Sequence, residues 1–161
     1  AGGGYVGICA GAYMAAIQPY QWGLDLLDAQ IVDHDHWARG IGPVKIELSK
    51  SGEKLFGPRT GPAEYHYGNG PILAPGGKAA IPDYEVLAWY RTGIGRNGAD
   101  PKVMINTPAI VRGHFGKGRV LVSSGHAEWS SGIESFLLRY VEWAAGRKQG
   151  VKDHPTPQAA P

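Results

Sequence analysis

The chain has 161 residues, a hydrophobic fraction of 43% and a charged fraction of 19%, which is typical of a single domain with one core. Its net charge is only +2, and its basic residues do not cluster, so the sequence predicts no nucleic-acid partner. No apolar run approaches the roughly 20 residues that span a bilayer, so no membrane segment is predicted. The single cysteine excludes an intramolecular disulfide and leaves the compartment open.

Hydrophobic periodicity predicts several strands and two helices in chain order. Strands are expected at 5–9, 29–33, 43–49, 63–73, 84–90, 109–115 and 119–125. The second of two hairpins turns at 116–118, and the first joins 43–49 to a strand at 53–57 through Ser51-Gly52. Helices are expected at 11–18 and 132–146, and the proline-rich stretch 148–161 is predicted to be a disordered tail. The folded domain is therefore expected to span residues 1–147.

This order of elements favours an α/β fold. We expect a three-layer, flavodoxin-like arrangement with a mostly parallel sheet and antiparallel hairpin additions. A first strand that leads into a catalytic corner is normally central in such a sheet and needs neighbours on both sides. The sequence is therefore expected to lack the first part of the domain.

The stretch GICAG (7–11) places the only cysteine between two glycines, where a strand gives way to a helix. Gly-x-Cys-x-Gly is the thiol form of the turn that presents a catalytic nucleophile. Glycines two positions on either side, Gly7 and Gly11, are expected to relieve crowding between the neighbouring backbones. A helix that starts near Ala10 points its N–H groups at the sulfur, but stabilises an anion by only about 0.3–1 kcal/mol. A base is therefore expected beside Cys9.

The best candidate for that base is His126, directly after a predicted strand. Glu128 lies two residues further on, so its carboxylate is expected to hold one imidazole nitrogen while the other nitrogen faces the thiol. Alternatively, Cys9 is a small buried hydrophobic residue with no chemistry.

The stretch Asp33-His34-Asp35-His36 offers a second set of polar side chains. His-x-His between carboxylates is able to bind a metal ion such as zinc, although no third cluster of ligands accompanies it. The alternative is a solvated loop between strands. We predict neither a metal nor a cofactor.

Two longer stretches support a family resemblance: GGGYVGICAGAYMA (2–15) and HFGKGRVLVSSGHAEW (114–129). They resemble the class I glutamine amidotransferase-like superfamily, and within it the branch found at the N-terminus of some biotin–protein ligases. The resemblance implies a nucleophile at Cys9, a base at His126 and an orienting acid at Glu128. It also implies that the Ala10 N–H contributes to an oxyanion hole.

Two positions depart from that pattern. The family usually has Gly-His-Gln after the nucleophile, and this chain has Gly11-Ala12-Tyr13. Tyr13 and Gly11 are expected to face the substrate pocket, and the loss of Gln argues against glutamine as the substrate. The usual Pro after the catalytic His is Ala127.

The residues leave two main functions open. The first is a thiol-dependent amidase or hydrolase that acts on a small-molecule or peptide amide through Cys9. The second is a catalytically inactive ligand-binding or regulatory module with the same fold. We also expect the first strand to pair with a preceding segment or with another copy of the chain, since it holds no Lys or Pro that would protect a free edge.

Overall fold

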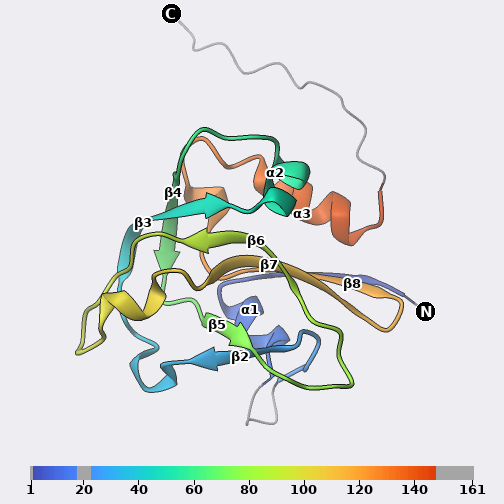
Figure 1. Cartoon of the computed structure of the whole chain (residues 1–161), viewed down its shortest axis with the longest axis horizontal. Helices are drawn as coiled ribbons and strands as arrows, with labels where there is room; N and C mark the ends of the chain where they lie inside the picture. The colour runs from blue at the N-terminus through green and yellow to red at the C-terminus, as the bar shows by residue number, and fades with distance from the viewer. Residues whose placement is uncertain (1, 18–22, 148–161) are drawn as a thin grey trace, which may run out of the picture.

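The computed structural model describes residues 2–17 and 23–147, in which strands predominate (Figure 1). The strands are β1 (Gly4–Ile8), β2 (Ala29–Val32), β3 (Ile41–Leu48), β4 (Ala63–Gly68), β5 (Ile72–Pro75), β6 (Glu85–Tyr90), β7 (Pro108–Phe115) and β8 (Gly118–Ser123). The helices are α1 (Ala10–Ala15), α2 (Lys50–Phe56) and α3 (Phe136–Ala144), with 3-10 turns η1 (His34–His36), η2 (Pro101–Met104) and η3 (Ala127–Trp129). The predicted tail and the end of the predicted first helix lie outside the described residues.

The main sheet has six strands in the order β1-β8-β7-β6-β3-β4. Only β1 and β8 pair in parallel; the pairs β8–β7, β7–β6, β6–β3 and β3–β4 are antiparallel. A separate antiparallel ribbon joins β2 and β5. Register shifts between β6 and β7 around Ala88 interrupt the ladder, and such irregularities bend and twist a strand.

The expected fold class is therefore wrong. The molecule is a curled, mostly antiparallel half-barrel sheet rather than a mostly parallel three-layer α/β sandwich. The physical reason lies in the connections. Parallel neighbours need a crossover of a dozen or more residues, usually a helix, whereas a two-residue turn such as 116–117 fixes antiparallel pairing. The hairpin β7–β8 was predicted correctly. The pairs β3–β4 and β6–β7 are antiparallel as well, although longer segments, 49–62 and 91–107, join their strands.

The segment after β3 also differs from its prediction, because it forms helix α2 instead of the second strand of a hairpin. The Ser49 side chain accepts a hydrogen bond from the Gly52 N–H at 3.0 Å, which caps the helix. Glu53 stands in the first turn, where the helix dipole favours a negative charge. Ser51-Gly52 was interpreted as a hairpin turn, although Ser49 and the residues after it suit a helix start.

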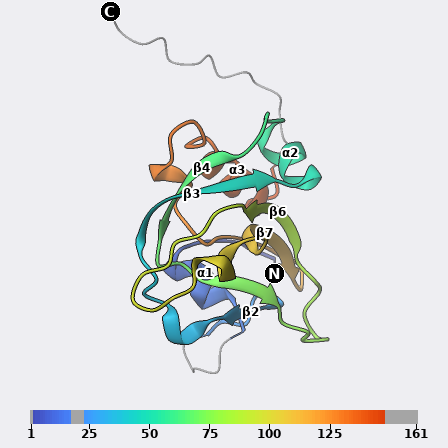
Figure 2. The ribbon, with the colours of Figure 1, turned by 60° about the vertical axis from the view of Figure 1, so that its left-hand side comes forward.

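Residues 63–73, predicted as one strand with a turn at Asn69-Gly70, belong to two different sheets. β4 is an edge strand of the main sheet and pairs with β3, whereas β5 pairs with β2 in the separate ribbon (Figure 2). Asn69 has a left-handed φ of 58°, which redirects the chain between the two sheets. The turn was therefore placed correctly, but it connects sheets and does not close a hairpin.

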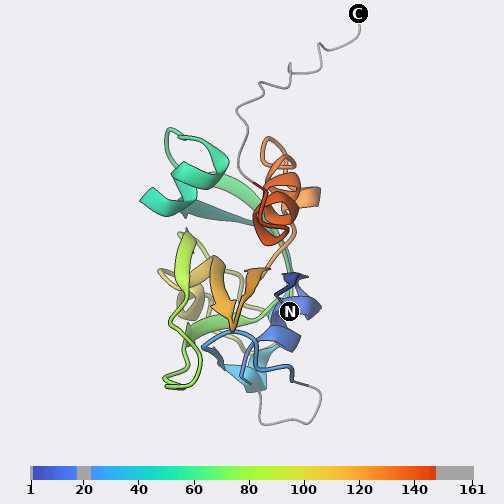
Figure 3. The same ribbon diagram turned by 90° about the vertical axis from the view of Figure 1, so that its right-hand side faces the viewer.

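The centre of the main sheet is buried on both faces. Along β8, Leu121 packs in the larger core cluster, whereas Val120 and Val122 pack in the smaller one. Helices α2 and α3 cover the first face, and α1 with the β2–β5 ribbon covers the second (Figures 1 and 3). β1 lies between α1 and α3 at the edge of the sheet, so the corner after Ile8 is held by packing from both sides. None of the helices in the described ranges is long and apolar enough to cross a membrane.

Candidate active site around Cys9

Cys9 occupies a strained turn between β1 and α1. Its backbone angles are φ 52° and ψ −102°, a combination that non-glycine residues rarely adopt and that costs about 1–3 kcal/mol. The Cys9 N–H donates to the carbonyl of Ser123 at 2.9 Å, so the turn is anchored to the end of β8. Strain of this kind persists where the surrounding structure holds it, and it is common at catalytic sites.

The two glycines of the GICAG stretch have different roles. A Cβ on Gly7 would lie 2.6 Å from the Gly11 carbonyl oxygen and 2.7 Å from the Tyr5 ring, so the close approach of β1 and α1 requires glycine there. At Gly11 a Cβ would meet only the Tyr5 hydroxyl, at an ordinary 3.5 Å. The prediction of crowding is confirmed for Gly7 and wrong for Gly11.

The thiol of Cys9 is half-buried and donates a hydrogen bond to the Gly68 carbonyl at 3.3 Å. Burial raises the pKa of this thiol above its ordinary value, the Ala10 N–H acts in the opposite direction, and the charge of Glu128 raises the pKa further. The group is therefore a neutral thiol near pH 7. Because the Ala10 N–H does not overcome burial, formation of a thiolate needs a base.

His126 and Glu128 form the hydrogen-bonded pair that their spacing predicts. The His126 Nδ1 lies 2.7 Å from the Glu128 Oε1. The Trp129 ring stacks on the imidazole, with ring centroids 4.1 Å apart and an interplanar angle of 13°. The His126 N–H donates to the His66 carbonyl at 2.8 Å, which fixes the backbone against β4. The ring is thus held by its Nδ1 and one face, which leaves Nε2 as the nitrogen available for chemistry.

Gly68 at the end of β4 is where the thiol and the imidazole converge. Its carbonyl accepts a hydrogen bond from the Cys9 thiol. The His126 Nε2 lies 3.5 Å from the position that a Cβ on Gly68 would occupy. Within the described ranges, no hydrogen bond joins Cys9 directly to His126. The structure therefore brings the nucleophile and base candidates to the same glycine without closing the contact between them.

A cavity of about 610 Å³ opens beside Cys9. It is lined by Cys9, Ala10, Tyr13, Met14, His34, Trp37, Gly68 and Asn69. Tyr13 was predicted to face the substrate and does line this cavity. Burial raises its pKa to about 12, and its hydroxyl donates to the Asn69 carbonyl at 3.2 Å. Gly11, predicted with it, is not part of the wall; its carbonyl accepts from the Tyr5 hydroxyl at 2.7 Å.

The two histidines of the 33–36 stretch have different surroundings. His34 lines the cavity, whereas His36 is 44% exposed and places its Nδ1 2.6 Å from Asp33. In the described part of the chain, no group of three or more His, Cys, Asp or Glu side chains is arranged to hold a metal ion. The hydrogen bond with His36 and, to a smaller extent, the pairing with Arg39 lower the pKa of the Asp33 carboxyl.

Sequence reasoning missed several residues of this site. Arg39 is 1% exposed and pairs with Asp33, which braces the segment that carries Trp37. Gly68 and Asn69 were interpreted only as a turn. An arginine three residues after an Asp-His-Asp-His stretch gave no signal of burial, because burial depends on elements that are far away in the sequence.

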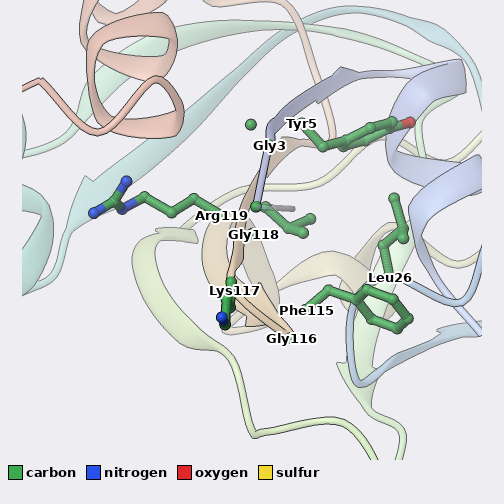
Figure 4. Close-up of a pocket in the computed structure, with 11 residues that line it drawn as sticks. Gly3, Tyr5, Leu26, Phe115, Gly116, Lys117, Gly118 and Arg119 are labelled. Atoms are coloured by element: carbon green, nitrogen blue, oxygen red, sulfur yellow. The ribbon is translucent and has the colours of Figure 1, made fainter.

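A second cavity, of about 540 Å³, lies next to the start of β1 and the β7–β8 turn (Figure 4). Tyr5, Leu26 and Phe115 form one side of it, and the Arg119 side chain points away from them. Of the predicted site residues, none lines this cavity. The cavity at Cys9 therefore carries the candidate chemistry.

Comparisons with known proteins identify no family. No family model matches the chain, and no curated protein matches it. Among solved structures, it is similar to the β-galactosidase from Bacillus circulans sp. alkalophilus, with a TM-score of 0.48 and 17% sequence identity over 88% of this chain. The chain spans 19% of the length of that protein, and a likeness at this level identifies neither the activity nor the substrate of the chain.

The resemblance to the glutamine amidotransferase-like superfamily, and to the biotin–protein ligase branch within it, is corrected by these findings. No family model matches the chain, and its curled, mostly antiparallel sheet differs from the helix-flanked sheet of that superfamily. Short stretches around a cysteine and a histidine suggested the family. Those stretches encode two local corners, which different sheets are able to present.

Proposed function

We propose that this chain is a thiol-dependent hydrolase that cleaves an amide or a related acyl bond with Cys9 as its nucleophile. His126 acts as the general base and Glu128 as the residue that orients it. The single observation that carries the proposal is the convergence at Gly68 of a thiol in a strained strand-to-helix turn and an imidazole held by a carboxylate.

The reaction runs through two displacements. The His126 Nε2 takes the Cys9 proton, and the sulfur attacks the carbonyl carbon of the substrate, whose oxygen becomes negative. The carbon–nitrogen bond breaks, the nitrogen leaves with the proton from His126, and a thioester remains on Cys9. Water, deprotonated by the same imidazole, then attacks the thioester, releases the acid and regenerates the thiol.

Each residue has a role that its surroundings favour. The Glu128 carboxylate at Nδ1 sets the tautomer in which Nε2 accepts a proton, and it stabilises the imidazolium that forms. The Ala10 N–H, which already lowers the pKa of the thiol, is a donor for the developing oxyanion. The resting hydrogen bond from Cys9 to Gly68 must break first, because the thiol proton has to turn towards His126.

Selective modification of Cys9 tests the proposal, and the single cysteine makes the measurement unambiguous. The chain is treated with an activated ester such as p-nitrophenyl acetate, and the acyl group on Cys9 is measured by mass spectrometry alongside p-nitrophenol release. We expect a thioester on Cys9 and turnover, both reduced at least about 100-fold in His126→Ala, which is the usual contribution of a general base. The matched control is His114→Ala, an exposed histidine on β7.

The alternative, a ligand-binding module without turnover, also has an observation in its favour. The thiol donates to Gly68 and burial raises its pKa, as in an inert buried cysteine. If Cys9 is acylated no faster than free cysteine at pH 7, and His126→Ala leaves that rate unchanged, the hydrolase proposal is wrong and the binding module remains.

A further inference from the structure

The cavity beside Cys9 has the size and the position of a substrate pocket. Its volume of about 610 Å³ lies within the roughly 300–1,000 Å³ that small-molecule sites occupy. Cys9 and Ala10 form part of its wall, so a molecule in the cavity lies against the thiol and the first N–H of α1. The shape of the cavity therefore determines which acyl groups reach the nucleophile.

The walls of this cavity are apolar and aromatic. Trp37 and Met14 are 57% and 42% exposed, so both present apolar surface at the cavity. Tyr13 contributes an aromatic ring, and its hydroxyl donates to the Asn69 carbonyl. Of the eight described residues that line the cavity, none is Lys, Arg, Asp or Glu.

The segment that carries Trp37 is held in place from behind. Arg39 pairs with Asp33 across Trp37, and the Arg39 carbonyl accepts a hydrogen bond from the Arg96 N–H at 2.9 Å. The Asn97 side chain donates to the Ala38 carbonyl at 2.7 Å. Trp37 is therefore an exposed ring on a braced backbone, and such a ring loses little conformational freedom when a ligand packs against it.

We propose that this cavity selects a neutral, apolar acyl group, best an aromatic one, with Trp37 as the specificity-determining residue. The inference rests on the proposed hydrolase function and adds the substrate class to it. An aromatic group on the carbonyl packs between Trp37 and Met14, where it gains ring contacts and removes apolar surface from water. Apart from His34, no described lining residue has a side chain that pairs with a charged group, so such a group loses its hydration with little compensation.

Three related alkylating reagents test the selection without requiring turnover. Iodoacetamide is small and neutral, iodoacetate is small and anionic, and N-benzyl-iodoacetamide carries an aromatic ring. The rate at which each reagent alkylates Cys9 is divided by its rate with free cysteine, which removes intrinsic reactivity. We expect the normalised rate of the benzyl reagent to exceed that of iodoacetamide by at least about 5-fold, which is within the range of one aromatic contact.

Variants assign that preference to the cavity. Trp37→Ala should lower the benzyl-to-iodoacetamide ratio towards one, and Met14→Ala should lower it in part. Phe115→Ala, which removes an exposed ring from the other cavity, should leave the ratio unchanged. Trp37→Phe, which keeps a ring, should retain most of the preference and provides a second test if Trp37→Ala does not fold.

The outcomes separate this inference from the proposed function. A ratio of one or less in the unmodified chain, or a normalised preference for iodoacetate, overturns the aromatic selection even if His126→Ala abolishes turnover. A ratio that survives Trp37→Ala overturns the assignment to Trp37. If His126→Ala leaves acylation unchanged while the benzyl preference holds, the cavity selects as inferred and the hydrolase proposal is what fails.

Discussion

The substitution Gly7→Ala tests the geometry of the Cys9 turn directly. The new Cβ would lie 2.6 Å from the Gly11 carbonyl oxygen and 2.7 Å from both the Gly11 carbonyl carbon and the Tyr5 ring. Ordinary contacts are roughly 3.5–4 Å, so β1 and the start of α1 must separate by about 1 Å. Two of the three contacted atoms belong to backbone, which adapts less easily than a side chain.

The cost of this separation follows from general magnitudes. Overpacking of a well-packed site costs about 1–3 kcal/mol, and the lower entropy of the unfolded Ala variant returns about 0.4–1 kcal/mol. We expect Gly7→Ala to lower the free energy of unfolding by about 1–2 kcal/mol. For a chain of this length that lowers Tm by about 2–8 °C.

Gly11→Ala is the matched control, because its Cβ would meet only the Tyr5 hydroxyl at 3.5 Å. In helix α1, Ala is favoured over Gly by up to about 1 kcal/mol, so this variant should be as stable as the parent or more stable. Urea unfolding of both variants measures the difference. Equal destabilisation by the two substitutions, or a Gly7→Ala chain as stable as the parent, would refute the argument that only Gly7 is required by the close approach of β1 and α1.

Three further predictions address charge, burial and capping. Folding raises the pKa of the Cys9 thiol, so the stability that the protonated thiol contributes is complete below the ordinary thiol pKa. That contribution is lost as the pH rises through the pKa of the folded state. Between pH 8 and 10, Cys9→Ala should therefore lose less stability than the parent in urea titrations. Arg39→Ala leaves Asp33 without its buried partner and should cost about 3 kcal/mol, and a double variant with Asp33→Asn should cost less than the sum of the two. Ser49→Ala removes the bond to the Gly52 N–H and should cost about 1 kcal/mol, whereas Ser49→Asp should keep most of the cap.

Much of the candidate site could be predicted from short stretches of sequence. The corner at Cys9 and the pairing of His126 with Glu128 depend on residues within a few positions of each other, and local spacing restricts such geometry strongly. The roles of these residues in catalysis stay predictions. The wall of the cavity was not predictable in the same way, because Trp37 and Asn69 reach Cys9 from separate parts of the chain.

The fold itself was predicted less well, and the reason is physical. Alternating hydrophobic residues identify a strand but do not specify its neighbours or its direction, and a strand buried on both faces has the same pattern in parallel and antiparallel sheets. The motif around Cys9 favoured a parallel sheet. The sheet is instead mostly antiparallel: β7–β8 is a tight hairpin, several other pairs join strands that are far apart along the chain, and β1 pairs with β8 in parallel.

Local features follow from the sequence alone: most strand positions, the β7–β8 hairpin, the glycine required at position 7, and the spacing that pairs His126 with Glu128. Each depends on interactions between residues that are close along the chain. The position of Gly68, at the end of β4 and beside both the thiol and the imidazole, is visible only in the folded molecule, because it depends on strand order. Strand order results from the burial of the whole sheet between its helices and the β2–β5 ribbon, and no short stretch of sequence carries that information.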